Sequence, residues 1–226
     1  MRMIMGKHAI ETVLKESPER IVTIYSHKED YPFPVKVLSK KSLSELVESD
    51  SHQGLVAKVR ERNFLNPNEF LEEGRSRSLV LMVDSIQDPQ NFGAILRAAE
   101  CFGVDAVLYS KNRNVGLTPA VSKASVGASE IVPLMPISNL YDTMRKFQER
   151  GYFSIAAEAR ENSLPLNSFE YPSCTLLIVG AEGNGIQPLL SKHADVHLAI
   201  PMRGSIDSLN VSQATALFLS HFKWSD

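Results

Sequence analysis

Residues 84–97 combine an amide and an arginine that could act on a ligand. The stretch reads D-S-I-Q-D-P-Q-N-F-G-A-I-L-R and contains Asn91 and Arg97. Asn91 stands near a predicted helix start, where its side chain could cap the helix. Arg97 follows in a helix of Ala, Ile and Leu. It either reaches solvent along an apolar surface or points its guanidinium at an anionic or hydroxyl-bearing ligand.

A glycine-rich turn follows a later apolar run, in the stretch L-I-V-G-A-E-G-N-G-I. Its three glycines, beginning with Gly180, allow a close approach of backbone to a ligand. The pattern is neither a phosphate-binding P-loop nor a dinucleotide fingerprint, because no Gly-Lys-Ser/Thr follows and the turn comes late in the chain. Glu182 is the residue that a plain turn would not require.

A third polar stretch, A-I-P-M-R-G-S-I-D-S-L-N-V-S, joins an apolar run to the last predicted helix. Ser208 or Asn210 can cap that helix, and the free backbone N–H groups of the loop can take up ligand atoms. A capped helix start explains one of these polar residues. It does not explain Ser208, Asn210 and Gly204 together, so we interpret the loop as part of a binding site.

The elements that position these stretches form an alternating pattern from Leu79 onward. Near-continuous apolar runs, typical of strands buried on both faces, cover 79–83, 106–109, 130–134, 153–157, 175–179 and 196–200. Helix-like segments lie between them, at 91–102, 118–125, 139–150, 186–193 and 209–222. This alternation predicts a parallel α/β sheet, in which ligands bind beyond the carboxyl ends of the strands. The three polar stretches all follow predicted strands.

The first sixty residues form a smaller predicted α/β unit. A helix is expected at 7–16, strands at 21–25, 35–38 and 54–59, and a helix opened by Ser42 with Glu45 as a capping box. We therefore predict a domain at 1–60, a linker with one short helix at 61–78, and a larger domain at 79–226. The residues 1–62 carry eleven Lys and Arg against nine Asp and Glu, which permits a basic face there.

Composition narrows the class of protein further. The chain has 226 residues and a net charge of −2, so its net charge does not indicate a nucleic-acid partner. No apolar run approaches the ~20 residues of a membrane span, and no signal peptide is recognised. Two cysteines fit a reducing cytosol, and we expect a cytoplasmic protein. His193 and His197 lie on different predicted elements, and we favour a site without metal.

Taken together, N-F-G-A-I-L-R, G-A-E-G-N-G and I-P-M-R-G-S-I-D-S-L-N-V-S resemble the three ordered motifs of the SpoU-type RNA ribose 2′-O-methyltransferases of the SPOUT superfamily. The N-terminal G-K-H-A-I-E-T-V-L and H-Q-G-L-V-A-K-V resemble the substrate-binding domain of the branch that methylates a guanosine in 23S ribosomal RNA. That domain looks shortened here between about Ser26 and Ser42.

The resemblance implies a fold, a cofactor and a partner that spacing alone did not indicate. It implies a deep trefoil knot in the larger domain, S-adenosylmethionine as methyl donor, an RNA substrate and a homodimer. The catalytic positions that it implies are Asn91, Arg97, Glu182, Ser208 and Asn210. The cofactor-binding positions are Gly180, Ile200, Met202, Gly204 and Leu209.

Alternatives remain open within and outside this family. A nicotinamide-dependent oxidoreductase would carry a glycine fingerprint after the first buried strand, and D-S-I-Q-D-P-Q-N stands there instead. A transfer-RNA ribose 2′-O-methyltransferase and a non-catalytic RNA-binding paralogue are the other two. RNA binding would rest on local basic groups rather than net charge, and the candidates are Arg2, Lys7, Lys40, Lys41, Lys58, Arg60 and Arg62.

Overall fold

The computed structural model describes residues 1–181 and 183–223. The chain forms two compact units, each assembled from separate stretches of sequence. One unit comprises residues 1–63, 88–97 and 116–131, and the other comprises 64–87, 98–115 and 132–226. Helix α4 (Pro89–Cys101) contributes residues to both units.

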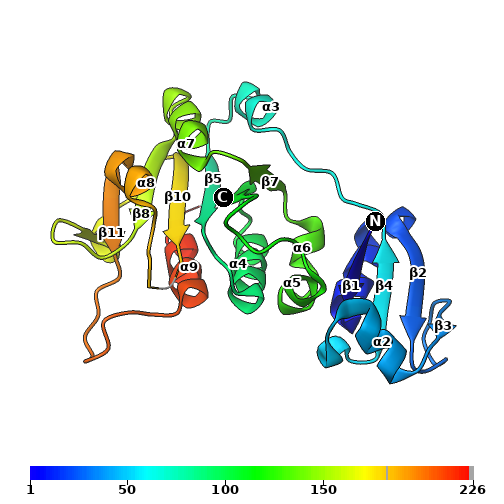
Figure 1. Ribbon diagram of the computed structural model, residues 1–226. Helices are drawn as coiled ribbons and strands as arrows, with labels where there is room; N and C mark the ends of the chain where they lie inside the picture. Colours follow the sequence, from blue (N-terminus) through cyan, green and yellow to red (C-terminus); the bar gives the residue numbers. More distant parts are fainter. Residues whose placement is uncertain (182, 224–226) are drawn as a thin grey trace. The chain divides into compact units, whose positions relative to one another are not determined.

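A seven-stranded sheet organises the second unit (Figure 1). Its order is β7-β6-β5-β10-β8-β11-β9, and all neighbouring pairs in the described residues are parallel. The strands are β5 (Ser78–Asp84), β6 (Ala106–Ser110), β7 (Leu134–Ile137), β8 (Phe153–Ala157), β9 (Leu164–Pro165), β10 (Cys174–Gly180) and β11 (Val196–Ala199). The predicted parallel α/β fold is therefore confirmed.

Both faces of this sheet are buried, which explains why its strands are apolar without interruption. Val80 and Met82 share one face, where they belong to a core with residues of the neighbouring strands. Leu81 points to the opposite face because side chains alternate along a strand, and it is also 0% exposed. The helices of this unit are α3 (Pro67–Glu72), α7 (Leu140–Glu149), α8 (Pro188–His193) and α9 (Val211–Ser220). Of these, α3, α7 and α8 supply side chains to the core on the Val80 face.

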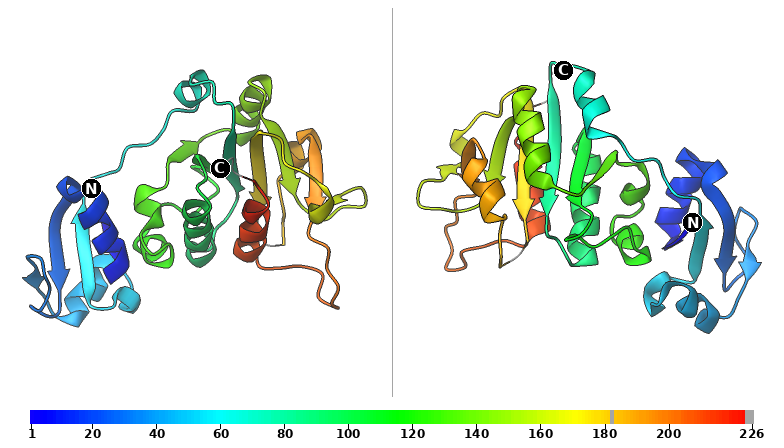
Figure 2. Two further views of the ribbon diagram at one scale, coloured as in Figure 1. Left: turned by 180° about the vertical axis from the view of Figure 1, so that it is seen from behind. Right: turned by 45° about the horizontal axis from the view of Figure 1, so that its top comes forward.

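The end of the chain crosses back over the sheet. Strand β11 lies on the far side of β8 from β10, yet α9, which follows β11, contacts β10. Figure 2 shows α9, coloured red, beside the yellow β10 in both views. The segment 200–210 thus spans more than one strand before α9 begins. This return is compatible with the trefoil knot, which stays a prediction.

A four-stranded sheet with the order β1-β4-β2-β3 lies in the first unit. Its strands are β1 (Arg2–Met5), β2 (Ile21–Ser26), β3 (Lys36–Val37) and β4 (Leu55–Val59), and its helices are α1 (Lys7–Glu16), α2 (Lys40–Val47), α5 (Pro119–Ala124) and α6 (Ala128–Ile131). Ile10 of α1 packs in a core with Leu55, whereas Leu43 of α2 packs in a second core with Val56. The alternating strand β4 therefore buries both of its faces.

A buried carboxylate ties α6 to the β1 end of this unit. The side chain of Glu130 is 0% exposed, and its Oε2 lies 2.5 Å from Nη2 of Arg2 and 2.9 Å from Nη2 of Arg20. Burial opposes ionisation of Glu130, but the charges and hydrogen bonds of the two arginines outweigh it, so its pKa lies below the ordinary value. Arg2, a candidate RNA contact, is thereby used within the protein.

Several predicted boundaries are wrong for identifiable reasons. Strand β1 was not predicted, because R-M-I-M is too short to show a period. Helix α2 begins earlier than expected, since Ser39 is the N-cap and its Oγ accepts a hydrogen bond from Ser42 N at 3.1 Å. The run 130–134 is not a strand: its first residues belong to α6, and β7 starts only after Pro133.

The predicted division at 60 and 78 stays a proposal. Helix α3 is the short helix expected in 61–78, with Asn66 as its N-cap. The compact units follow a different grouping, in which α5, α6 and the first part of α4 join residues 1–63.

Candidate functional site

The carboxyl ends of the parallel strands share one edge of the seven-stranded sheet. Asp84 ends β5, Ala157 ends β8, Gly180 ends β10 and Ala199 ends β11. Two of the polar stretches singled out in the sequence, 180–185 and 201–212, leave from this edge. The predicted grouping of strand ends is thus present in the second unit.

A pocket of about 160 Å³ lies at this edge, between the ends of β8 and β11 and the start of α9. Its walls are mostly apolar and include Ile200, Met202 and Leu209, three of the predicted cofactor-binding residues. Ser208, predicted to be catalytic, lines it as well. The outer wall is the loop 201–210, in which every residue is exposed. Residues predicted to bind the cofactor and a residue predicted to be catalytic therefore line the same pocket.

The charged side chains lining this pocket, among residues that the structure describes, are both acidic. They are Glu158 and Asp207. Glu158 is ion-paired with Arg160, so the carboxylate of Asp207 beside the apolar walls is the charge that favours a ligand with a positive charge and an apolar body.

Glu158 is a site residue that the sequence analysis missed. Its Oε1 accepts a hydrogen bond from Ser191 Oγ and lies 3.2 Å from Nε2 of His197 and 2.8 Å from Nε of Arg160. The carboxylate is held by side chains from three different segments, so its position is well defined. The available signal was its place directly after the strand F-S-I-A-A, at the ligand-binding end of a parallel strand.

Gly180 and Gly204 do not line the pocket. A Cβ on Gly180 would overlap the backbone of Gly185, which folds back against it: Gly185 N donates a hydrogen bond to Ala181 O at 2.9 Å. The close approach of the backbone at Gly185 therefore explains why position 180 is a glycine, without any ligand. Glu182 lies outside the described residues.

Asn210 provides the N-cap of α9, as one of the sequence alternatives proposed. Its Oδ1 accepts hydrogen bonds from Ser212 N at 2.9 Å and from Ser212 Oγ at 2.6 Å. The cap fixes the point where the exposed loop becomes a helix, next to the pocket residue Leu209.

Asn91 and Arg97 lie on α4. Asn91 is inside the helix rather than at its cap, because Asp88 takes the capping role: its carboxylate accepts hydrogen bonds from Gln90 N at 3.1 Å and Asn91 N at 3.3 Å. Arg97 is exposed. Gly93 serves close packing between helices, since a Cβ there would come 2.9 Å from Ser125 N near the end of α5.

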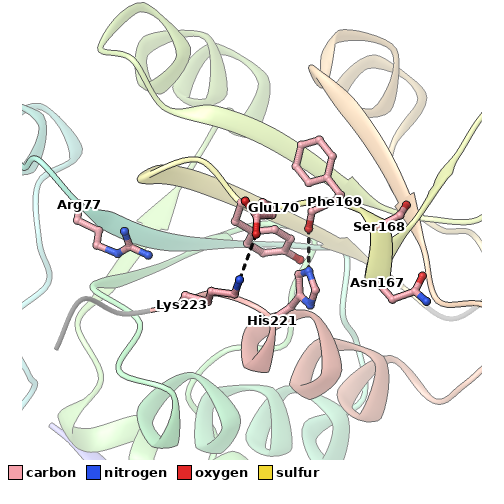
Figure 3. Close-up of a pocket in the computed structure, with 8 residues that line it drawn as sticks. Arg77, Asn167, Ser168, Phe169, Glu170, His221 and Lys223 are labelled. Atoms are coloured by element: carbon pink, nitrogen blue, oxygen red, sulfur yellow. Dashed lines mark hydrogen bonds and ion pairs between the residues drawn. The ribbon is translucent and has the colours of Figure 1, made fainter.

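A second cavity, of about 370 Å³, lies at the opposite edge of the same sheet, beside Arg77 and Tyr171 (Figure 3). Both residues precede strands, β5 and β10. His221 Nε2 lies 2.7 Å from Phe169 O, and Lys223 Nζ lies 3.2 Å from Glu170 Oε1. Figure 3 marks both contacts with dashed lines. None of the predicted site residues that the structure describes lines this cavity.

The described residues contain no group of three or more His, Cys, Asp or Glu side chains arranged to hold a metal. His193 Nδ1 lies 2.9 Å from Leu189 O, and His197 Nε2 lies 3.1 Å from Ser191 Oγ, so each ring has a partner within the protein. Within the same residues, no helix is long and apolar enough to span a membrane.

Two family models match the chain. Residues 78–220 match the SpoU rRNA Methylase family, and residues 3–65 match the description "RNA 2′-O ribose methyltransferase substrate binding". Together these matches cover both the alternating strand-and-helix region and the small N-terminal sheet.

Named relatives resemble the chain over nearly its whole length. It is 38% identical to the 23S rRNA (guanosine-2′-O-)-methyltransferase RlmB of Shewanella oneidensis, across 96% of this chain and 94% of that protein. The RlmB of Vibrio cholerae is 35% identical over the same shares. Among solved structures, the SpoU methyltransferase AviRb of Streptomyces viridochromogenes, crystallised with AdoMet, has the same fold: the TM-score is 0.78 at 21% identity, covering 97% of this chain and 88% of that one.

Proposed function

Because the chain belongs to the SpoU rRNA methylase family, we propose that it transfers a methyl group from S-adenosylmethionine to the ribose 2′-oxygen of a guanosine in 23S ribosomal RNA. The observation that carries the proposal is the pocket at the carboxyl edge of the sheet. It joins three predicted cofactor-binding residues with two carboxylates. The match of residues 3–65 to an RNA substrate-binding domain supports an RNA substrate.

The pocket suits S-adenosylmethionine chemically. The cofactor supplies a methyl group already activated by a positively charged sulfonium, so we propose no role for a metal. Ile200, Met202 and Leu209 offer apolar surface for the adenosine, while Asp207 attracts positive charge. Gly180 and Gly204 would contribute backbone groups at the two ends of the site.

The remaining work of the protein is to orient the ribose and to help the 2′-hydroxyl lose its proton. We propose that Arg97 polarises the 2′-oxygen or binds the neighbouring phosphate. An arginine side chain keeps its proton at neutral pH, so the neutral guanidine that could act as a base is scarcely populated. The proton of the 2′-hydroxyl then leaves to water or to a phosphate oxygen. Asn91, Ser208 and Asn210 would orient the ribose and the start of α9, and Glu182 would accept a hydrogen bond that fixes Arg97 or its own turn.

The direct test is methyl transfer with labelled S-adenosylmethionine. Purified protein should label unmodified 23S ribosomal RNA at the 2′-oxygen of one guanosine. Arg97→Lys separates two roles of the arginine: a charge role retains measurable activity, whereas a bidentate role loses about 100-fold or more. Arg97→Lys and the wild type should bind the cofactor equally, because Arg97 does not line the pocket.

The same assay decides between the alternatives. Label on transfer RNA but not on 23S RNA would show a transfer-RNA enzyme instead. RNA binding with no label on either substrate would show a non-catalytic RNA-binding protein, and would refute the proposed activity.

We further propose that the protein works in the cytoplasm as a homodimer. The loop 201–210 and α9 carry exposed apolar side chains, among them Ile206, which is 71% exposed, and Leu217, which is 46% exposed. Contact with a second copy of the chain would remove these side chains from water, which supports the proposed homodimer. Cys101 and Cys174 are free thiols, as a reducing compartment permits. Light scattering on the purified protein measures the oligomeric state.

A further inference from the structure

A second cleft opens on the carboxyl edge of the seven-stranded sheet, beside the ends of β6 and β7. Its volume is about 300 Å³. The polar side chains that line it are Ser110, Arg113, Ser138, Asn139, Tyr141 and Gln187. Ser110 is the last residue of β6, and Ser138 directly follows β7. Because all strands run parallel, this cleft lies on the same edge as the pocket assigned to the cofactor.

Arg113 is the cationic residue of this cleft. It is exposed, and among the described residues it forms no ion pair with a carboxylate. Its guanidinium donates a hydrogen bond to Oε1 of Gln187, a neutral acceptor. Arg113 therefore keeps its charge unneutralised by direct pairing and has further N–H groups to donate, since a guanidinium carries five.

A chain of hydrogen bonds that starts at a buried carboxylate holds Arg113 in place. Asp84 is 0% exposed, and its two carboxylate oxygens accept hydrogen bonds from the backbone and side-chain amides of Gln187, the backbone one at 2.8 Å. This orients the Gln187 amide so that its oxygen faces Arg113. The loop of Arg113 is also pinned: Ile86 N donates to Asn114 Oδ1 at 2.9 Å, and Val115 N donates to Ile86 O at 2.8 Å.

We infer that this cleft is a subsite for a phosphate of the RNA chain near the modified nucleotide, and that Arg113 binds that phosphate. The inference rests on the proposed function. A guanidinium that is oriented in advance, has no carboxylate partner among the described residues and lines a cleft with several polar side chains matches the planar, bidentate geometry of phosphate recognition. Asp84 and Gln187 act as positioning residues, because they reach the phosphate only through Arg113.

The test measures the binding of Arg113→Gln and of the wild type to an unmodified 23S RNA fragment that contains the target guanosine. Binding is measured at several salt concentrations. We expect affinity to fall about three- to tenfold near 100 mM salt and the slope of log K against log salt to become shallower by about 0.7–0.9, the value of one lost phosphate contact. KM for RNA should rise while the Kd for S-adenosylmethionine stays unchanged. Arg113→Lys should keep the salt slope.

Arg150→Gln is the matched control. Arg150 is also an exposed arginine, but it follows α7 and precedes β8, which places it at the opposite, amino edge of the sheet. Its substitution should leave RNA affinity and salt slope at the wild-type values. If the wild type binds and methylates the RNA, and Arg113→Gln has the same RNA affinity and salt slope as the wild type, the phosphate subsite is refuted and the proposed function stands. A wild type that neither binds nor methylates the RNA would overturn the proposed function and the subsite with it.

Discussion

Glu158 and Asp207 give the candidate cofactor pocket its electrostatic character. Glu158 is anchored by Ser191, His197 and Arg160, whereas Asp207 stands on an exposed loop. S-adenosylmethionine loses its sulfonium charge when the methyl group leaves. If the cofactor binds in this pocket as proposed, the carboxylate of Asp207 should favour binding of the donor over binding of the product S-adenosylhomocysteine.

Asp207→Asn should weaken binding of S-adenosylmethionine about two- to fivefold, the scale of an exposed charge pair. Binding of S-adenosylhomocysteine should change less, because the product lacks the sulfonium charge. Calorimetric titration with both ligands measures the two dissociation constants. The control is Asp142→Asn, an exposed carboxylate in the first turn of α7 that does not line the pocket. Equal weakening of both ligands would argue against an electrostatic role.

Residue types could be assigned to the site from sequence where a motif carried them. Ile200, Met202, Leu209 and Ser208 were predicted and line one pocket. Glu158 and Arg113 were not, because each follows an ordinary strand and has no distinctive neighbours. Their positions become informative only when parallel pairing brings the strand ends to one edge. A carboxylate or guanidinium just after a buried parallel strand is the signal to look for.

At the scale of elements, the buried Glu130 ion pairs stabilise the junction of α6 with β1 and the segment before β2. Arg2 is the first residue of β1, and Arg20 immediately precedes β2. Removal of one partner from a buried ion pair leaves the others unpaired, which usually costs more than the pair itself contributes.

Glu130→Gln should lower the free energy of unfolding at pH 7 by about 3 kcal/mol. The native pKa of Glu130 is below its ordinary 4.5, so its stabilising contribution is complete above that value and is lost as pH falls through the native pKa. The difference between variant and wild type should therefore shrink in acid. Urea unfolding at neutral and acidic pH measures it. Glu16→Gln, an exposed carboxylate beside Lys15, is the control; a difference that persists unchanged in acid would contradict this assignment.

Most elements could be predicted because their periods are strong. Helix α1 matches its predicted range, and the long buried strands were placed to within a residue or two. The errors fall where tertiary contacts decide. The run 130–134 is apolar, yet Glu130 is used for ion pairing and its segment becomes helical. No local pattern could have placed α5 and α6 with residues 1–63.

On the scale of the whole molecule, recognition of RNA must come from local charge, since the net charge is −2. Lys40 and Lys41 at the start of α2 are exposed and form no ion pair among the described residues.

The double variant Lys40→Gln with Lys41→Gln should make the slope of log K against log salt shallower by about 1.4–1.8, which corresponds to the loss of two phosphate contacts. Filter binding to 23S RNA across a salt series measures this. Lys15→Gln, whose amine pairs with Glu16, is the control; an unchanged slope in the double variant would exclude α2 from the RNA-binding surface.

Strand β10 is inserted between β5 and β8, although both precede it in the chain. A ribosome that synthesises this protein at about 5–20 residues per second therefore releases β8 about 1–3 seconds, and β5 about 4–18 seconds, before their common neighbour β10 emerges. Until then the strand edges that β10 will cover stay open. The nascent chain is prone to aggregate during that interval and would benefit from a chaperone that covers those edges. The pocket at the ends of β8 and β11 stays incomplete until α9 has been made, because Ala214 and Phe218 of α9 line it and α9 follows both strands in the chain.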